Sequence, residues 1–202
     1  MMKNLIVARV ACVALLALTG LAIAADAPPP ADDATRLVRA AEIDRSGLFA
    51  LQQAMRKGQK AKASQPETEA VKTYYACVYA ADFGQFTKTY AEQIAKGMSV
   101  EEIQEVTRFY EGAAGKKQVA RDFILIKEAF GTRDPDEKIE PPTSEESSEL
   151  EKFQATAAAK KFLGPDVLHS DALMQALSAK TNEMLKGCAK LAKKEPAPAP
   201  AK

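Results

Sequence analysis

The sequence has few of the residues on which catalytic and metal chemistry most often depends. It contains one histidine, His169, and three cysteines among 202 residues. A single imidazole beside two ordinary acids, Asp166 and Asp171, makes a weak set of metal ligands, because zinc sites combine several strong donors. No Cys-x-x-Cys pair is present, which disfavours a thiol-exchange enzyme. The sequence therefore predicts no catalytic residue, no metal ligand and no cofactor-binding residue.

The chain also lacks an excess of charge and the pattern of a β-sheet. Its 28 basic and 27 acidic residues give a formal net charge of +1, whereas nucleic-acid-binding domains carry a basic stripe. Alternating runs of β-branched residues are missing, while the strong helix formers Ala, Lys, Glu, Gln and Leu are abundant. Charge thus gives no case for a nucleic-acid partner, and the composition predicts an all-α fold.

Residues 1–24 have the features of a cleavable signal peptide. Lys3 and Arg9 give a positive start, a short apolar run follows at Val10–Leu18, and Ala22-Ile23-Ala24 offers small residues to a signal peptidase. The apolar run is too short to span a membrane, so an uncleaved anchor is the weaker alternative. We therefore expect cleavage after Ala24, a periplasmic or secreted location, and no transmembrane segment in the mature protein.

Proline-rich segments mark both ends of a single helical domain. Residues 25–33 contain three consecutive prolines and no periodic apolar residues, which predicts a disordered lead-in. Residues 193–202 contain alternating proline and alanine, which is typical of an extended, solvated tail. Such a tail keeps a domain clear of a surface, and binding to the cell wall or an envelope protein is the alternative. The helical domain is predicted over residues 34–192.

Apolar spacing predicts a bundle of about six or seven helices in this domain. One helix is expected over Asp33–Ile43, with Ser46-Gly47 as the break before the next. The most apolar segment, Glu67–Lys96, carries a tyrosine-rich stripe and is expected at the centre of the bundle, with a kink or split at Gly84. At helical spacing such a stripe more often belongs to the core than to a ligand groove. The inner face of a later helix, over residues 118–130, is predicted to comprise Val119, Phe123, Ile126 and Phe130.

One segment of the chain occurs twice. Ser99–Lys117 is echoed by Thr143–Lys161 at a constant offset of 44 residues (143 − 99 = 44). In each copy a hydroxyl residue, paired acids, an aromatic residue, small residues and two lysines follow in the same order. The hydroxyl residue and the glutamate three positions later predict a capping box at each helix start. The offset predicts two related helix pairs that pack as neighbours, and a chance likeness between two capped helices is the alternative.

The first copy contains the motif Phe109-Tyr110-Glu111-Gly112-Ala113-Ala114-Gly115-Lys116. This motif resembles exported bacterial proteins that carry the domain of unknown function 2059, which share a helix with paired glutamates followed by Phe-Tyr-x-Ser-Pro-x-Gly-Lys. The Phe-Tyr pair, the Gly and the Lys match, while Gly112-Ala113 stands where the family prefers Ser-Pro. The resemblance extends to the aromatic segment Tyr74–Tyr90 and covers about a fifth of the mature chain.

The resemblance implies an all-helical exported protein, and it carries over no catalytic or binding residue. The motif still supplies the candidates for an interaction site. These candidates are Phe109, Tyr110, Gly112, Gly115 and Lys116.

Cys77 and Cys188 are the only cysteines that follow the predicted signal peptide. In an oxidising compartment two such cysteines usually form a disulfide, and the alternative is that both are buried thiols or that one is reactive. A disulfide would close a loop of 111 residues (188 − 77 = 111) and tie the last helix to the central one. In the chain-entropy model, a loop of that length stabilises the folded state by about 4–5 kcal/mol.

Taken together, these features predict a non-enzymatic binding or interaction module of the cell envelope. Its partner would be another envelope protein or a small ligand. One alternative is a periplasmic chaperone or stress protein. Another is an enzyme that uses a tyrosine and lysine face around Tyr110 and Lys116.

Overall fold

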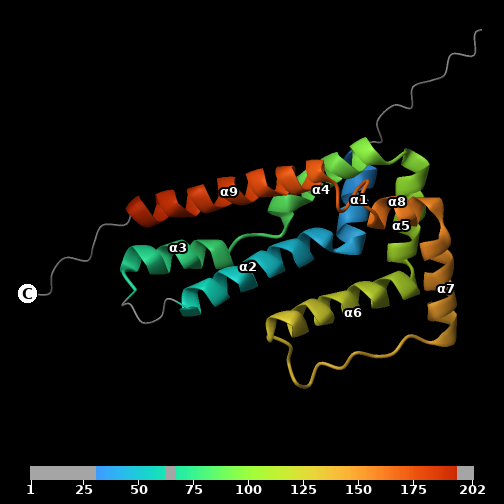
Figure 1. The fold of residues 1–202 in the computed structure, drawn as a ribbon, viewed down its shortest axis with the longest axis horizontal. Helices are drawn as coiled ribbons and strands as arrows, with labels where there is room; N and C mark the ends of the chain where they lie inside the picture. Colours follow the sequence, from blue (N-terminus) through green and yellow to red (C-terminus); the bar gives the residue numbers. More distant parts are fainter. Residues whose placement is uncertain (1–30, 62–66, 195–202) are drawn as a thin grey trace, which may run out of the picture.

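The structure, a computed structural model, describes residues 31–61 and 67–194 (Figure 1). The predicted signal peptide, residues 25–30 of the predicted lead-in and residues 195–202 of the predicted tail lie outside these ranges. The described residues form nine helices and no strand, which confirms the all-α fold. In chain order the helices are α1 (Ala31–Ala41), α2 (Ile43–Ala61), α3 (Glu69–Tyr79), α4 (Gly84–Gly97), α5 (Val100–Glu111), α6 (Ala113–Phe130), α7 (Ser144–Ala155), α8 (Ala157–Leu163) and α9 (Asp171–Lys194).

The helices form an elongated bundle whose two ends are built differently (Figure 1). At one end α9 runs antiparallel to α3, and α2 extends toward the same end. At the other end α5, α6, α7 and α8 form a corner joined by short connections and one longer loop. Between the two ends α1 packs against α4 and α5, and α4 also packs against α9.

The core is centred on α1 and its neighbours. Leu37 of α1, Ile94 of α4 and Ile103 of α5 are completely buried. Apolar residues recur at three- and four-residue steps along these helices, so each helix turns one apolar face toward the others. The expected centre, Glu67–Lys96, contributes α4 to the core, but Val78 is the only buried residue of α3. The prediction that this whole segment is central is therefore wrong for α3.

The number of helices exceeds the predicted six or seven because two expected helices are each divided. The segment Glu67–Lys96 forms α3 and α4, which meet close to Gly84, where the sequence predicts a kink or split. The segment that begins at Thr143 is divided at Thr156 into α7 and α8. Thr156 has an extended backbone, and its hydroxyl accepts a hydrogen bond from the Ala159 N–H. This residue therefore ends one helix and caps the next.

The predicted helix break at Ser46-Gly47 is wrong. The chain turns four residues earlier, at Glu42, which has a left-handed backbone with φ of 47°, and α2 continues through Gly47. A Cβ atom at Gly47 would lie 2.8 Å from the hydroxyl oxygen of Tyr90 in α4. The glycine thus permits the close approach of two helices instead of forming a turn.

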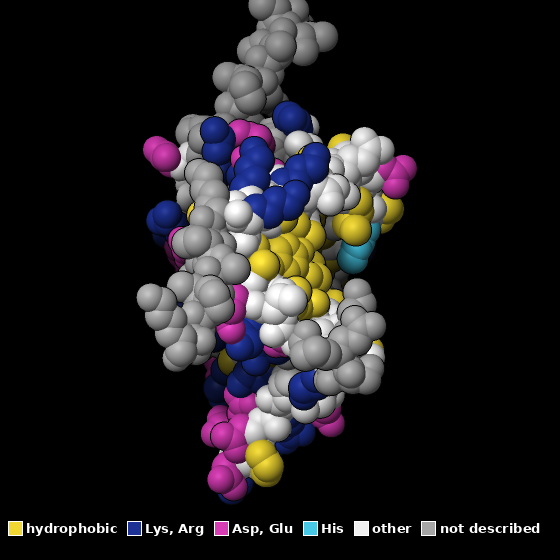
Figure 2. Space-filling view, turned by 90° about the vertical axis from the view of Figure 1, so that its left-hand side faces the viewer, with side chains coloured by type: hydrophobic (Ala, Val, Ile, Leu, Met, Phe, Trp, Pro, Cys, Tyr) yellow, Lys and Arg dark blue, Asp and Glu magenta, His cyan; other side chains and the backbone are white. Residues whose placement is uncertain are grey.

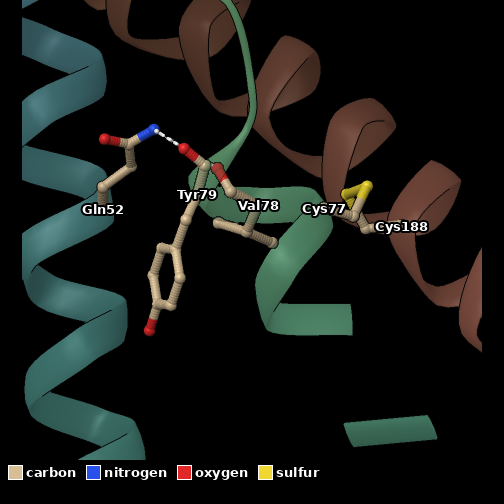
Figure 3. Close-up of a disulfide and its surroundings, with 5 residues drawn as sticks. All are labelled: Gln52, Cys77, Val78, Tyr79 and Cys188. Carbon is tan, nitrogen blue, oxygen red and sulfur yellow. Dashed lines mark hydrogen bonds between the residues drawn. A yellow bond between two sulfur atoms is a disulfide. The ribbon is translucent and has the colours of Figure 1, made fainter. Parts of the chain in front are cut away.

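The predicted disulfide between Cys77 and Cys188 is present and joins α3 to α9 (Figure 3). The two Cα atoms lie 5.5 Å apart. On the other side of α3, the side-chain amide of Gln52 in α2 donates hydrogen bonds to the carbonyl oxygens of Val78 and Tyr79. The disulfide and these hydrogen bonds therefore hold the C-terminal turn of α3 between α9 and α2.

Candidate functional site

The repeated segment forms two helix pairs with matching boundaries. Helices α5 and α7 begin 44 residues apart (144 − 100 = 44), and α6 and α8 begin at the same offset (157 − 113 = 44). The predicted capping boxes are confirmed, since Ser99 bonds with Glu102 and Thr143 bonds with Glu146 in both directions. Each box satisfies backbone N–H groups that the first helical turn leaves free. The same local sequence signal therefore starts both pairs.

The two helix pairs pack against each other in a reciprocal way. The rings of Phe109 and Phe153, which occupy equivalent positions, stack with their centroids 3.8 Å apart and an angle of 2° between planes. Helix α5 packs against α8, and α6 packs against α7. In a two-fold arrangement, residue i contacts residue j of the partner and the reverse contact also forms. The corner has this geometry within a single chain.

Two ion pairs complete the reciprocal contact. Lys117 of the first pair lies 2.8 Å from Glu146 of the second, and Lys161 of the second lies 2.9 Å from Glu102 of the first. The hydrogen bond from Lys117, together with that from the Thr143 N–H, lowers the pKa of Glu146. Burial opposes the same effect at Glu102, but hydrogen bonds from Lys161 and the Ser99 N–H still lower its pKa. Each capping glutamate thus also binds the other helix pair.

The aromatic candidates Phe109 and Tyr110 belong to the core of this corner. Both side chains are buried, and the Tyr110 ring makes edge contacts with Phe153 and Phe162 at centroid distances of 5.8 and 6.0 Å. Burial, reinforced by the negative charge of Asp122, raises the pKa of Tyr110 to about 12. The phenol therefore stays protonated at neutral pH and packs as an aromatic core residue.

The glycine candidates shape the turn between α5 and α6. Gly112 ends α5 and precedes α6 with an extended backbone. Gly115 lies where the first turn of α6 crosses the end of α5, and a Cβ atom there would be 2.5 Å from the Cα of Tyr110 and would overlap the Phe109 carbonyl oxygen. No side chain fits at this position without moving backbone.

Lys116 lines a pocket that the other four motif candidates do not line. This cavity, which we call the α2–α6 pocket, has a volume of about 330 Å³. It lies between the α1–α2 junction and the outer face of α6, and the loop after α6 adds one residue to its wall. The lining residues are Ala40, Glu42, Arg45, Lys116, Val119, Ala120, Phe123, Ile124, Lys127 and Glu137.

The charges of the α2–α6 pocket are paired except for Lys116. Arg45 lies 2.6 Å from Glu42, and Lys127 lies 2.6 Å from Glu137. The Lys116 ammonium has no hydrogen bond or ion pair with any described residue, although its charge contributes to lowering the pKa of Glu111. The pocket therefore presents one uncompensated positive charge to whatever enters it.

Aromatic rings beneath these cations form the apolar part of the pocket. The Arg45 guanidinium lies 4.2 Å from the centroid of the Phe123 ring, and the Lys127 ammonium lies 5.5 Å from it. Phe49 of α2 reaches across to the same ring, with centroids 5.1 Å apart. Cations placed over aromatic faces are attracted to them and are thereby held in position. The arrangement combines an apolar floor with fixed positive groups.

The prediction that α6 buries Phe123 and its neighbours is wrong in degree. Val119, Phe123, Ile126 and Phe130 are half-buried, and the buried residues of α6 are Ala114 and Gly115 in its first turn. Only that turn is enclosed by α5 and α7, so the rest of α6 faces α2 across the pocket. The sequence does signal this surface, because Lys116 and Lys127 flank Phe123 along α6, but the apolar spacing fits a core face equally well.

Within residues 31–61 and 67–194, no group of three or more His, Cys, Asp or Glu side chains is placed to hold a metal ion, and His169 is exposed in the α8–α9 connection. None of the helices in these ranges is both long and apolar enough to cross a membrane.

Comparison with known proteins gives no relative for this chain. No protein-family model matches it, and no curated protein or solved structure matches it significantly. The resemblance of Phe109–Lys116 to the exported bacterial family stays a prediction.

Proposed function

We propose that this protein is a non-enzymatic binding module of the cell envelope, and that its α2–α6 pocket holds a small anionic ligand with an apolar portion. The observation that carries the proposal is Lys116, an unpaired cation beside an aromatic floor. A volume of about 330 Å³ falls within the roughly 300–1,000 Å³ that is usual for small-molecule sites. Such sites combine apolar walls with a few placed polar groups, and this pocket has that composition.

Binding is favoured over catalysis by the position of the tyrosine. Tyr110 has a pKa of about 12 and lies in the core, so it does not share the α2–α6 pocket with Lys116. A general acid or base works best with a pKa near the operating pH and within reach of the substrate. The face around Tyr110 and Lys116 therefore supports an enzyme less well than a binding protein.

Export to the envelope is part of the proposal. It is supported by the signal-peptide features of residues 1–24 and by the Cys77–Cys188 disulfide, since disulfides persist mainly in oxidising compartments. We expect the protein recovered from a Gram-negative host to begin at Ala25 by mass spectrometry. Recovery with residues 1–24 still attached would contradict cleavage.

We also infer that α5–α6 and α7–α8 are two copies of one structural unit. The inference is supported by element boundaries that repeat at one offset and by the stacked equivalents Phe109 and Phe153. The reciprocal lysine–glutamate pairs add to this support. Lys116 and Lys160 are then equivalent positions, but Lys116 lines the α2–α6 pocket and Lys160 does not.

That equivalence provides a matched test of ligand binding. Anilinonaphthalene sulfonate, an aromatic anion, serves as the probe, and its fluorescence titration gives a Kd for each variant. Lys116→Ala is expected to weaken binding about tenfold, because one charge-assisted contact in a half-open pocket is worth about 1.4 kcal/mol. Lys160→Ala removes the same charge elsewhere and should leave the Kd unchanged. Equal affinities for the wild type and both variants would refute a role for Lys116.

A further inference from the structure

The end of the bundle formed by α2, α3 and α9 carries an apolar surface beneath basic side chains. Figure 2 looks onto this end, where hydrophobic side chains gather in the middle of the described surface and Lys and Arg side chains lie directly above them. We call it the tip. The tip lies opposite the α5–α8 corner and is separate from the α2–α6 pocket in its lining residues.

The apolar part of the tip comes from facing turns of α3 and α9. The Cys77–Cys188 disulfide ties these antiparallel helices, so residues before Cys77 lie beside residues after Cys188. Leu191 is 55% exposed and Val71 is 38% exposed, although both continue faces that are buried further along their helices. Within the described residues, the bundle therefore leaves the end of this apolar seam open.

Tyrosines extend the seam toward α2. Tyr74 and Tyr75 are half-buried with ring centroids 5.3 Å apart, and Tyr75 stacks on Tyr79 at 5.9 Å. Arg56 of α2 lies 4.6 Å from the centroid of the Tyr79 ring. Tyrosine has an apolar ring and a polar hydroxyl, and it is enriched where proteins meet the headgroup layer of a membrane.

The basic part of the tip is dominated by α9. Lys186, Lys190 and Lys193 are exposed, share the outer side of the helix and make no ion pair with described residues. Lys60 of α2 is also exposed there and is likewise without an ion pair, whereas the Lys57 ammonium lies over the Phe130 ring of α6. The acids of this end, Glu67 and Glu69, are engaged with Gln59 and Lys72 respectively. Gln59 is neutral, so Glu67 keeps its charge, but the four unpaired lysines outnumber it and the local charge is positive although the chain as a whole is nearly neutral.

We propose that the tip docks on an anionic membrane surface. The lysines meet lipid phosphates, while Leu191 and the tyrosines enter the headgroup layer. A basic rim around an amphipathic aromatic surface suits a lipid bilayer, because long lysine side chains keep their charge in water while their stems lie along apolar surface. Each lysine near an anionic bilayer raises affinity roughly fivefold.

Vesicle sedimentation with the protein recovered from a Gram-negative host tests this proposal. The wild type is expected to bind vesicles of equal parts phosphatidylglycerol and phosphatidylcholine far more tightly than vesicles of phosphatidylcholine alone. The combined substitution Lys186→Gln, Lys190→Gln and Lys193→Gln should lower the affinity for anionic vesicles about a hundredfold. The protein is used as recovered after export, beginning at Ala25, and the residues outside the described ranges are the same in every variant, so differences between variants report on the tip.

A charge-matched control replaces three exposed lysines outside the tip, with Lys88→Gln, Lys138→Gln and Lys160→Gln. It should retain most of the binding, and thermal melting should show both triple variants folded. Equal losses in the two triple variants would overturn the proposal, as would no preference for anionic vesicles. Binding to soluble polyglutamate in place of vesicles would also overturn it and would identify an acidic protein as the partner.

Discussion

The helices α5 and α7 begin with the same capping box and carry equivalent phenylalanines, yet one is central and the other peripheral. Ile103 of α5 is completely buried, whereas its equivalent in α7 is Ser147. Tyr110 is likewise buried, and its equivalent, Gln154, is exposed. The shared residues build the contact between the two pairs. The residues that differ determine which of the two helices packs against the rest of the bundle.

Helix α1 covers the outer face of α5. Polar contacts with α1, as well as apolar ones, distinguish α5 from α7. Glu111 at the end of α5 forms two hydrogen bonds of 2.6 Å with Arg36 of α1. The position equivalent to Glu111 in α7 is Ala155, which is exposed. Helix α7 has no residue equivalent to Glu111 that could bond a neighbour like α1. Its outer face is therefore polar and exposed, whereas the same face of α5 packs against α1.

The second helices of the pairs differ in length. Helix α8 ends at Leu163 after seven residues, and Phe162 in it is completely buried. Helix α6 continues for 18 residues, and Gln118 stands where α8 has Phe162. The added length carries Phe123 and Lys127 past the corner, and these side chains line the α2–α6 pocket. The candidate site thus depends on the residues of α6 that extend beyond the length of α8.

The largest expected effect concerns the residue that both copies share. Phe109→Ala and Phe153→Ala should each lower the free energy of unfolding by about 4 kcal/mol, because each leaves a cavity and removes the stacked ring. The double variant should lose clearly less than the sum, since both single variants remove the same contact. Denaturant unfolding measures all three. Strict additivity would contradict a direct Phe–Phe contact at the centre of the corner.

A smaller loss of stability should distinguish Gly115 of α6 from Ala159 of α8, the small residues at equivalent positions. Gly115→Ala is expected to destabilise the fold by about 3 kcal/mol, because the new methyl group overlaps backbone at the end of α5. Ala159→Gly, the mirror change in α8, should cost only about 1 kcal/mol through helix propensity. Thermal or urea unfolding would detect the difference. Equal losses of unfolding free energy in the two variants would contradict the close backbone contact at Gly115.

The smallest effect concerns the reciprocal ion pairs. The pKa of Glu102 is lowered in the folded state, so its pairing with Lys161 stabilises the fold above the ordinary carboxyl pKa and is lost as the pH falls through the lowered value. Lys161→Met should therefore cost less than about 1 kcal/mol at neutral pH and nothing in acid. Unfolding free energies measured across this range give the comparison. A cost independent of pH would show that the lysine acts through packing alone.

Lys117→Met is the matched variant for the other ion pair. The pKa of Glu146 is also lowered, by Lys117 and the Thr143 N–H, so the stabilising effect should fade in the same direction as the pH falls. The two variants together test whether the corner is electrostatically symmetric.

Much of the corner could be predicted from local sequence. The capping boxes depend on residues three positions apart, and the structure contains both of them where the sequence predicts. The division of the second copy at Thr156 could not be predicted in this way, because threonine is tolerated within helices and its role as a cap depends on the turn it occupies. The sequence favours burial of Tyr110, because a tyrosine at helical spacing more often belongs to a core than to a ligand groove, and the structure shows it buried.

The candidate site was less predictable than the fold. The sequence motif includes Lys116, but the other four of the five candidate residues are packing elements of the α5–α6 turn or of the core. The partners of Lys116 in the α2–α6 pocket, Arg45 and Phe123, come from segments far apart in the sequence. Bringing them together requires the angle between α2 and α6, which depends on the contacts of α1 and α5 with α6.

The sequence by itself determined the all-α fold class, the two capped helix starts and the Cys77–Cys188 pairing. Those features depend on composition, on residues within one helical turn, or on the presence of only two cysteines after residue 24. The tertiary structure alone decided that α1 is central, that Gly47 lies within α2 against Tyr90, and that the outer length of α6 lines a pocket. Apolar periodicity says that a helix has a buried face, but the partner of that face is chosen by contacts between distant segments.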